Sequence, residues 1–445
     1  MSGTLQVETG PEAQTRVSRR ARVATSLLFL TNGAVFANLL PRYPQLKTEL
    51  GLSNAALGTA IAAFPLGALL AGLTAGALIH RFRSSRVAVL GTVLTAIAIL
   101  IAGLAGTWWV LAAALFVGGS LDAVVDVAQN AHGLRVQRRY GRSILNSFHA
   151  LWSVGAVLGG LMGSAAAGLD LPLAVHLSGS GVLFAAVALG AYRFLLPGPE
   201  SVERDVPPNP VDPRNPVDPP NPVDPVDPVD PVDRSEPARS VPSRFHLPAG
   251  TLLVLLALGV IACCGTVVED AGASWGALYL GGELRAEAAI AGLAFVALQG
   301  MQFVGRLLGD RMVDRFGQRT VARCGGVIVT VGMGAALAFP SIPLTIIGFG
   351  AAGFGVATLV PAAMHAADEW PGLAPGTGLS VISWLLRVGF LLSPPVVGVL
   401  ADASSLRVGL LLVPVAGILA IVLSPYLAPV QRVTVPPCLP TSDVR

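Results

Sequence analysis

The most constraining feature of the sequence is a series of apolar runs, each long enough to cross a lipid bilayer as a helix. A spanning helix needs about 20 apolar residues, and a spanning barrel strand needs about half as many. Only 12% of the residues are charged and the mean hydropathy is +0.68, which excludes a soluble globular chain. The fold class predicted is an all-α membrane protein with twelve transmembrane helices. These are expected at 23–41, 55–79, 87–106, 108–132, 143–168, 172–196, 249–280, 287–308, 320–339, 344–367, 376–401 and 407–427.

The two halves of the chain repeat each other weakly at an offset of 234 residues. Arg81 matches Arg315, and Gly155 matches Gly389, each with a matching neighbour. Two related helix bundles are a common plan for secondary transporters. We therefore expect two pseudo-symmetric six-helix bundles with a linker and two tails. Their predicted bounds are a cytoplasmic tail at 1–22, bundles at 23–196 and 248–428, a cytoplasmic linker at 197–247, and a cytoplasmic tail at 429–445.

The predicted linker has a composition of its own. Between Asn209 and Pro231 it repeats Val-Asp-Pro. Proline fixes φ and removes hydrogen-bond donors, and aspartate keeps a segment solvated. We interpret the segment as an extended, disordered spacer, and a docking role for the repeat is the alternative.

The basic residues predict the orientation of the chain in the membrane. Of 29 lysines and arginines, only Arg42, Lys47, Arg285 and Arg407 fall on one side, and Arg387 lies within a span. The rest lie on the side of both tails and the linker. Because cytoplasmic loops carry the excess of Lys and Arg, we expect a multi-pass protein of the cell (inner or plasma) membrane with both termini in the cytoplasm.

Two short segments that follow the second and eighth spans have related sequences. The second reads Asp-Arg-Phe-Gly-Gln-Arg at 314–319, and the first has His80 at the aspartate position and Arg83 at the second glycine. Together with the two six-helix halves, these segments resemble the inside-face motif of the major facilitator superfamily (MFS). The resemblance assigns to that motif Gly76, Arg81, Asp314, Arg315, Gly317 and Arg319.

Three further segments resemble a narrower branch of this superfamily. They are Asp126–Ala131, Ser147–Trp152 and Val268–Trp275, and they are similar to the fucose-permease-like branch and its uncharacterised bacterial relatives. Members of that branch are proton-coupled and use acidic residues in the first and fourth helices. The first span here offers asparagine instead, at Asn32 and Asn38.

Ionisable side chains within the spans are the candidates for proton coupling. A charge at mid-membrane costs about 2.5–3.5 kcal/mol, so such residues are functional candidates by default. Asp122 and Asp126 lie one helical turn apart, and we predict that one of them carries the proton. Glu269, favoured over the adjacent Asp270, and His149 are further candidates. A structural ion pair is the alternative reading of these residues.

Polar and aromatic side chains near the middle of the spans are candidates for substrate binding. Arg387 could bind an anionic group or pair with Asp122, Asp126 or Glu269, and the tryptophans could equally be packing residues. The full set is Asn32, Gln129, Asn130, Asn146, Trp152, Trp275, Gln299, Trp384 and Arg387.

These patterns predict a secondary active transporter. We expect it to be proton-coupled and to move a small sugar-like or other polar solute by alternating access. The alternatives are a proton-antiport efflux pump for a drug or secondary metabolite, and a membrane sensor that binds without transport. We expect no enzyme activity, because no nucleophile–base pair, metal-ligand spacing or phosphate-binding loop is present. The expected partners are the bilayer, a small solute and protons, with no cofactor and no nucleic acid, and the protein is expected to be a monomer.

Overall fold

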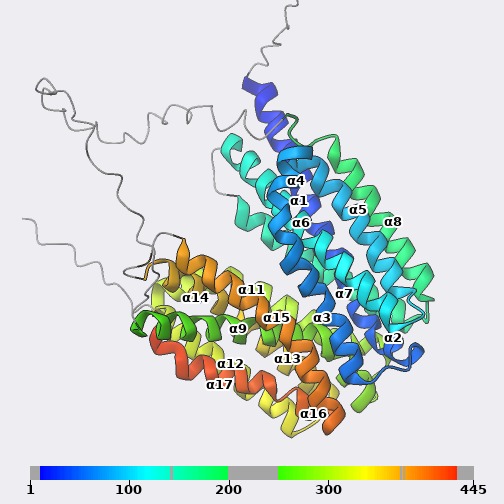
Figure 1. Cartoon of the computed structure of the whole chain (residues 1–445), viewed down its shortest axis with the longest axis vertical. Coiled ribbons are helices and arrows are strands. Elements are labelled where there is room, and N and C mark those ends of the chain that lie inside the picture. Colours follow the sequence, from blue (N-terminus) through cyan, green and yellow to red (C-terminus); the bar gives the residue numbers. More distant parts are fainter. Residues whose placement is uncertain (1–10, 141–143, 199–248, 371–372, 374–375, 428–445) are drawn as a thin grey trace, which may run out of the picture.

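The chain is described by a computed structural model that covers residues 11–140, 144–198, 249–370, 373 and 376–427 (Figure 1). Most of the predicted linker, residues 1–10 of the predicted N-terminal tail and all of the predicted C-terminal tail lie outside these residues. Within them the structure is helical and contains no strand. Lipid offers no partner to backbone N–H and C=O groups, so helices that satisfy their own hydrogen bonds are what the long apolar runs must form.

The described residues of the first half form eight α-helices. They are α1 (Pro11–Ala37), α2 (Tyr43–Glu49), α3 (Asn54–Ala71), α4 (Ala75–Phe82), α5 (Ser84–Gly103), α6 (Trp108–Tyr140), α7 (Leu145–Gly168) and α8 (Leu173–Tyr192), with short η1 (Leu40–Arg42) and η2 (Gly72–Thr74).

Those of the second half form nine. They are α9 (Ala249–Leu278), α10 (Ala288–Ala291), α11 (Leu293–Phe316), α12 (Gln318–Ala338), α13 (Ile342–Val356), α14 (Leu359–Asp368), α15 (Thr377–Ala403), α16 (Leu406–Gly409) and α17 (Leu412–Leu423), with η4 (Tyr279–Glu283) and η5 (Ser424–Tyr426).

Twelve helical stretches in the described residues are long and apolar enough to cross a membrane, which confirms the predicted fold class. Several are longer than the apolar runs alone indicate. The first reaches from Arg16 to Glu49, because polar residues continue the helix beyond the hydrocarbon region at both ends. The protein is therefore a multi-pass membrane protein.

Several of the spans consist of more than one helical element, and proline alone does not mark where the breaks fall. The second span changes from α3 to the 3₁₀ turn η2 at Gly72, whereas α3 continues unbroken through Pro65. The tenth divides between α13 and α14, next to Pro361, and α15 stays helical through Pro394 and Pro395. Proline in the first turn of a helix destabilises it little, because the N–H group that proline lacks has no partner there within the helix. This fits the position of Pro361 in the first turn of α14.

The predicted internal repeat is visible as repeated packing at the same offset. A Cβ added at Gly119 would lie 1.9 Å from the backbone oxygen of Phe64, and one at Gly353 would lie 2.0 Å from that of Leu298. Each pair joins the second and fourth spans of its half. Only glycine lets two helix backbones approach so closely. Such packing contacts hold helices together in a membrane, where the hydrophobic effect does not drive the association of helices.

The turns that follow the second and eighth spans also repeat. Arg83 has φ 74° and ψ 144°, and Gly317, at the same offset, has φ 79° and ψ 154°. The guanidinium of Arg81 lies over the ring of Phe82, as that of Arg315 lies over Phe316. The residue that replaces the family's glycine thus keeps a backbone conformation that favours glycine.

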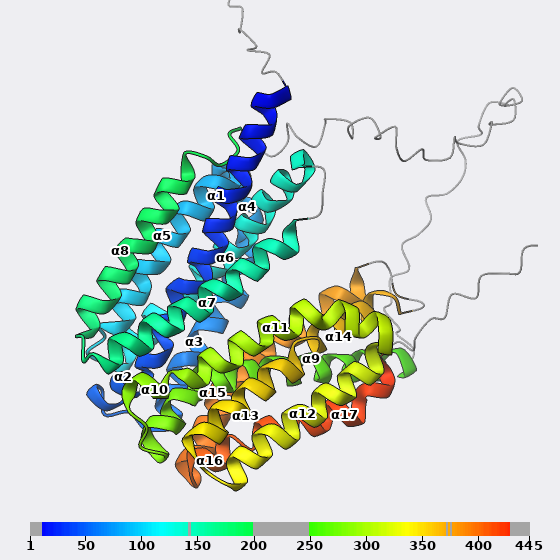
Figure 2. The same ribbon diagram turned by 180° about the vertical axis from the view of Figure 1, so that it is seen from behind.

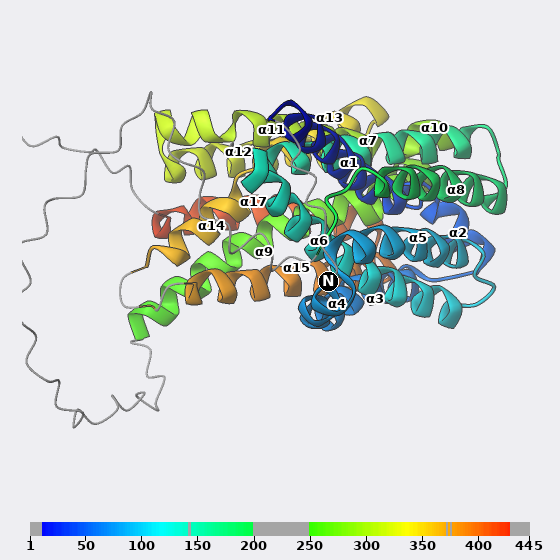
Figure 3. The ribbon, with the colours of Figure 1, turned by 90° about the horizontal axis from the view of Figure 1, so that it is seen from above.

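The two halves meet at one end and diverge at the other. Figure 2 shows the bundles together where α2 and α10 lie, and Figures 1 and 2 show them apart at the ends where α4 and α14 lie. Seen from above, α9, α12 and α14 extend away from α5 and α8 (Figure 3). Packing at the joined end is close, since a Cβ at Gly168 of α7 would lie 2.5 Å from Cβ of Ala289 in α10. The conformation is therefore open toward the side of the linker.

Candidate functional site

A chain of hydrogen bonds joins α1, α6 and α7 in the first half. Trp152 Nε1 donates to Asn32 Oδ1 at 2.8 Å, and Asn32 Nδ2 donates to Asp122 Oδ1 at 2.9 Å. The indole can only donate and the carboxylate accepts, so both ends of the chain fix the same orientation of the Asn32 amide. Asp122 is thus held by a neutral donor from the first helix, where the family resemblance places an acid.

A second chain lies one turn further along α6. Asn130 Nδ2 donates to Asp126 Oδ1 at 3.0 Å, and Asn130 Oδ1 lies 3.1 Å from His149 Nε2 of α7. Because Asn130 turns its oxygen toward the imidazole, a hydrogen bond between them requires a form of His149 that carries a proton on Nε2. Phe29 of α1 packs edge-on against this ring at 5.2 Å. A carboxylate and an imidazole are therefore linked through one amide.

The second half contributes a carboxylate with two partners on α11. Glu269 Oε2 accepts a hydrogen bond from Gln302 Nε2 at 2.8 Å and lies 3.7 Å from Arg306 Nη2. The pattern of basic residues predicts that Arg306 lies on the side of the linker, and it does not predict the contact with Glu269. The signal was the spacing of Gln302 and Arg306, which places both on one face of a helix. The neighbouring Asp270 instead accepts from Ser274 within α9, at 3.0 Å.

Charges of the second half act on titratable groups of the first half. Arg306 lies within electrostatic range of His149, and Arg387 lies within electrostatic range of Asp126, whose other positive neighbour is His149 of the same half. Arg387 also lies against the backbone of the first half, with Nη1 3.3 Å from a Cβ added at Gly72. It forms no ion pair with the described residues Asp122, Asp126 or Glu269, so the pairing considered for it is absent from this conformation.

We call these linked groups the polar centre. It consists of Asn32, Asp122, Asp126, Asn130, His149, Trp152, Glu269, Gln302, Arg306 and Arg387. Its side chains come from both halves and include three carboxylates, an imidazole and two guanidinium groups. Such a set can exchange protons and can offer hydrogen-bond donors and acceptors to a polar solute.

Several predicted binding residues lie outside the polar centre. Trp275 is 0% exposed and Gln299 2% exposed, so both pack inside the second half. Gln129 is buried and donates to the backbone oxygen of Leu28, which joins α6 to α1. Trp384 is 58% exposed on α15, and Asn146 is exposed at the start of α7.

The residues of the inside-face motif lie at two junctions of helices. Gly76 and Arg81 belong to α4, and Asp314 and Arg315 belong to the end of α11. Arg319, in the first turn of α12, donates from Nε to the backbone oxygen of Leu427 at 2.5 Å. The second copy of the motif thus ties α12 to the end of the last span.

Twelve spans in two repeated halves, with a polar centre between them, define a membrane protein of the solute-transporter class. Comparison with known proteins assigns the family: a model described as Major Facilitator Superfamily matches residues 25–269 and 255–443. The chain belongs to the major facilitator superfamily of transporters, which confirms the resemblance seen in the sequence.

Three known proteins indicate how far the similarity extends. The "Uncharacterized transporter y4wD" of Sinorhizobium fredii is 28% identical over 401 residues, which are 90% of this chain and 96% of that protein. The "Enterobactin exporter EntS" of Citrobacter koseri is 31% identical over 169 residues, 38% of this chain and 40% of that protein. The crystal structure of the nucleoside transporter NupG has a TM-score of 0.66 at 12% identity and covers 92% of this chain and 98% of that one. The last likeness is one of fold.

Proposed function

We propose that this MFS transporter is proton-coupled and moves a small polar solute by alternating access. The observation that carries the proposal is the Asp126–Asn130–His149 chain in the first half, which lies within electrostatic range of Arg387 in the second half. A proton-coupling group needs an environment that changes when the halves move. Asp126 has one, because Arg387, a positive neighbour besides His149 of its own half, belongs to the other half.

The coupling follows from this arrangement. When the halves rock, Arg387 changes its position relative to Asp126, and the free energy of keeping Asp126 charged changes with it. By linkage, protonation of Asp126 in turn favours one of the two conformations. Asp122 has a neutral partner, Asn32, on a helix of its own half. Asp126 is therefore our candidate for the transported proton, with His149 as its relay through Asn130.

A polar solute is the substrate class that suits this centre. Glu269, Gln302 and Arg306 offer acceptors and donors from the second half, and Asn32 and Trp152 offer them from the first. Hydrogen-bonding groups on both sides would let a sugar-like or other hydroxylated metabolite bridge the halves. We propose that the direction of transport is import. We also propose that the protein acts as a monomer in the cell membrane, with the linker and both termini in the cytoplasm.

Efflux is the second candidate function, because part of the chain is similar to an exporter. The match to the enterobactin exporter EntS spans 38% of this chain, at 31% identity. In an exporter the same acidic centre would exchange a proton for an outgoing drug or secondary metabolite. A protein that binds its solute but never moves it would instead act as a sensor.

A ligand screen followed by a transport assay tests these proposals. Purified protein is screened by thermal shift against sugars, polyols, nucleosides, organic acids and dyes, and the best binder is loaded into proteoliposome assays with an imposed pH gradient. We expect the imposed proton gradient to drive uptake of the solute by the wild-type protein. In Asp126→Asn, the uptake rate should no longer depend on the gradient. Expulsion driven by an opposed gradient would support efflux, and binding without any flux would support a sensor. Flux independent of pH in both proteins would overturn proton coupling.

A further inference from the structure

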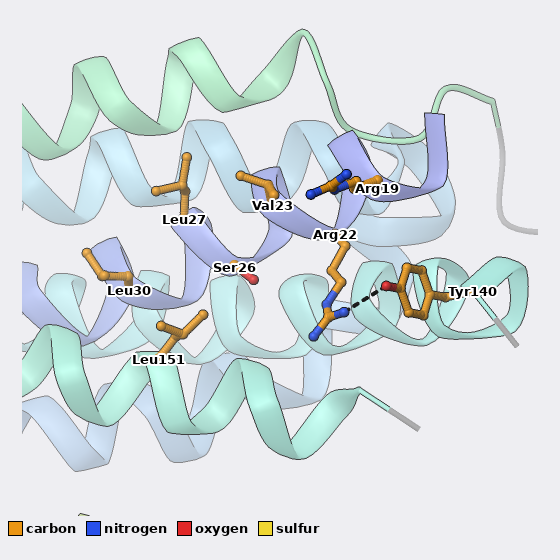
Figure 4. A pocket seen from close by; sticks show the side chains of 8 residues that line it. All are labelled: Arg19, Arg22, Val23, Ser26, Leu27, Leu30, Tyr140 and Leu151. Carbon is orange, nitrogen blue, oxygen red and sulfur yellow. Dashed lines mark hydrogen bonds between the residues drawn. The ribbon is translucent and has the colours of Figure 1, made fainter. Parts of the chain in front are cut away.

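An apolar groove with a basic end runs along α1, on the outer surface of the first half. Figure 4 shows it between α1, the end of α6 and the beginning of α7. The groove has a volume of about 500 Å³. Its lining residues are Arg19, Arg22, Val23, Ser26, Leu27, Leu30, Tyr140 and Leu151.

The groove faces away from the polar centre. Val23 is 56% exposed and Leu27 37% exposed, whereas Asn32, which holds Asp122, is 7% exposed. Nine residues of an α-helix make about two and a half turns, so Val23 and Asn32 point to opposite sides of α1. Because this side of α1 is turned away from the polar centre and carries apolar residues, we infer that it contacts the bilayer. The groove is therefore separate from the site proposed for the solute.

One end of the groove is positively charged and partly fixed in place. Arg22 Nη1 donates to Tyr140 Oη at 2.9 Å, and the guanidinium lies 4.9 Å from the centre of the Tyr140 ring. Arg19 is exposed and makes no hydrogen bond or ion pair with any residue that the structure describes. The lining contains no acidic side chain. Two arginines thus lie at one end of the apolar groove, Arg22 held by Tyr140 and Arg19 exposed beside it on α1.

The dimensions of the groove suit one leaflet of a bilayer. Arg19 and Leu30 are separated by about 16 Å along a helix that rises about 1.5 Å per residue. This is about half of the roughly 30 Å hydrocarbon thickness. The arginines begin the first span, where the headgroups of that leaflet lie, and the leucines follow at the depth of its acyl chains.

We propose that this groove is a binding site for one anionic phospholipid. The phosphate binds between Arg19 and Arg22, and one acyl chain packs along Val23, Leu27, Leu30 and Leu151. Guanidinium groups bind phosphate through paired N–H donors, and the Tyr140 contact orients Arg22 for it. The site differs from ordinary lipid contact because charge and apolar channel are aligned on one helix, so it selects the headgroup.

Native mass spectrometry of purified protein with an equal mixture of phosphatidylglycerol and phosphatidylcholine of identical chains tests the site. We expect the wild type to retain phosphatidylglycerol preferentially. The double variant Arg19→Gln/Arg22→Gln should weaken this binding by about fivefold for each arginine. Leu27→Trp, which fills the groove and keeps both charges, should weaken binding of both lipids.

A matched control distinguishes this site from general attraction to basic residues. Arg86 of α5 also contacts a tyrosine, Tyr192 of α8, with Nε 3.4 Å from Oη, but it lies outside the groove. Arg86→Gln should retain the wild-type preference. Equal retention of phosphatidylglycerol by the wild type and the double variant would overturn the proposal, as would equal binding of the two lipids. Displacement of the lipid by glycerol phosphate at low concentration would also overturn it, because the site would then be one for free phosphate.

Discussion

The Asp402 carboxylate, near the end of α15, accepts a hydrogen bond of 2.9 Å from the backbone N–H of Asn54, the first residue of α3. Its other oxygen accepts one of 2.8 Å from the N–H of Ala55. A carboxylate at a helix N-terminus satisfies free N–H groups and interacts favourably with the helix dipole. Because α3 and α15 belong to different halves, this cap exists only while the halves meet at the end away from the linker.

Removing the cap should therefore shift the conformational equilibrium. Asp402→Ala loses an N-cap worth about 1 kcal/mol, so the population open at this end should rise roughly fivefold. Double electron–electron resonance would measure this population from the distance between spin labels on the exposed residues Glu49 and Glu287, in a variant without native cysteines. Ser405→Ala is the matched control, because Ser405 caps α16 from within its own half, by accepting from Val408 N at 3.3 Å. An equal shift in both variants would contradict the role of Asp402 as a latch.

Protonation of Asp126 should be visible as a pH dependence of the same conformational equilibrium. In the wild type the distance between labels on the two halves should change with pH, since a neutral Asp126 no longer attracts Arg387. Asp126→Asn keeps an oxygen for Asn130 and should abolish the pH response. Asp122→Asn keeps an oxygen for Asn32, and the pH response of the distance should remain as in the wild type. A lost response in Asp122→Asn alone would assign the proton to Asp122 instead.

The contact between Glu269 and Arg306 should matter more for transport than for stability. At 3.7 Å, and with the arginine side chain 41% exposed, the ion pair contributes at most about 1 kcal/mol to folding. Glu269→Gln and Arg306→Gln should each lower the melting temperature little and abolish flux of the solute found in the screen. His365→Gln is the control, because His365 contacts Glu369 at 3.6 Å away from the polar centre. A large loss of stability without loss of flux would make the pair structural.

The spans and their repeat could be predicted from the sequence because they depend on local composition. A run of apolar residues must cross the bilayer, and a constant offset relates the halves whatever their packing. The partners of single side chains depend on which way each helix is turned. Arg306 was assigned to the linker side from its distance along the chain, yet α11 continues to Phe316 and its side chain lies beside Glu269.

The same limit applies to residues that pack within one half. Helices that are apolar on every side do not reveal in the sequence which side faces lipid and which the interior. Trp275 could equally be a binding or a packing residue on that basis, and the structure places it in the interior. The buried contact of His176 Nε2 with Asn38 Oδ1, at 2.9 Å, also joins residues far apart in the chain and had no local signal.

The turn at Arg83 should be strained, and relieving the strain should stabilise the protein. Its φ of 74° with ψ of 144° is a backbone conformation suited to glycine. A residue with a side chain held in such a conformation lowers the stability of the folded state by of order 1–3 kcal/mol. Arg83→Gly should raise the melting temperature, measured by dye-monitored unfolding in detergent. Gly317→Ala, at the equivalent turn, should lower it. A fall in Arg83→Gly would mean that the arginine side chain stabilises more than its backbone costs.

Close helix packing at Gly155 should make this position intolerant of any side chain. A Cβ added there would lie 2.0 Å from the backbone oxygen of Leu30, so even alanine forces α7 away from α1. The separation would also stretch the bond from Trp152 to Asn32, and with it the support of Asp122. We expect Gly155→Ala to lose several kcal/mol, as overpacked sites do, with reduced folded yield in size-exclusion chromatography. Gly190→Ala in α8 is the control: no atom lies within 4 Å of its added Cβ, and alanine favours a helix over glycine by about 1 kcal/mol. Unchanged yield and melting temperature in Gly155→Ala would contradict the close contact of α1 and α7, on which the geometry of the polar centre depends.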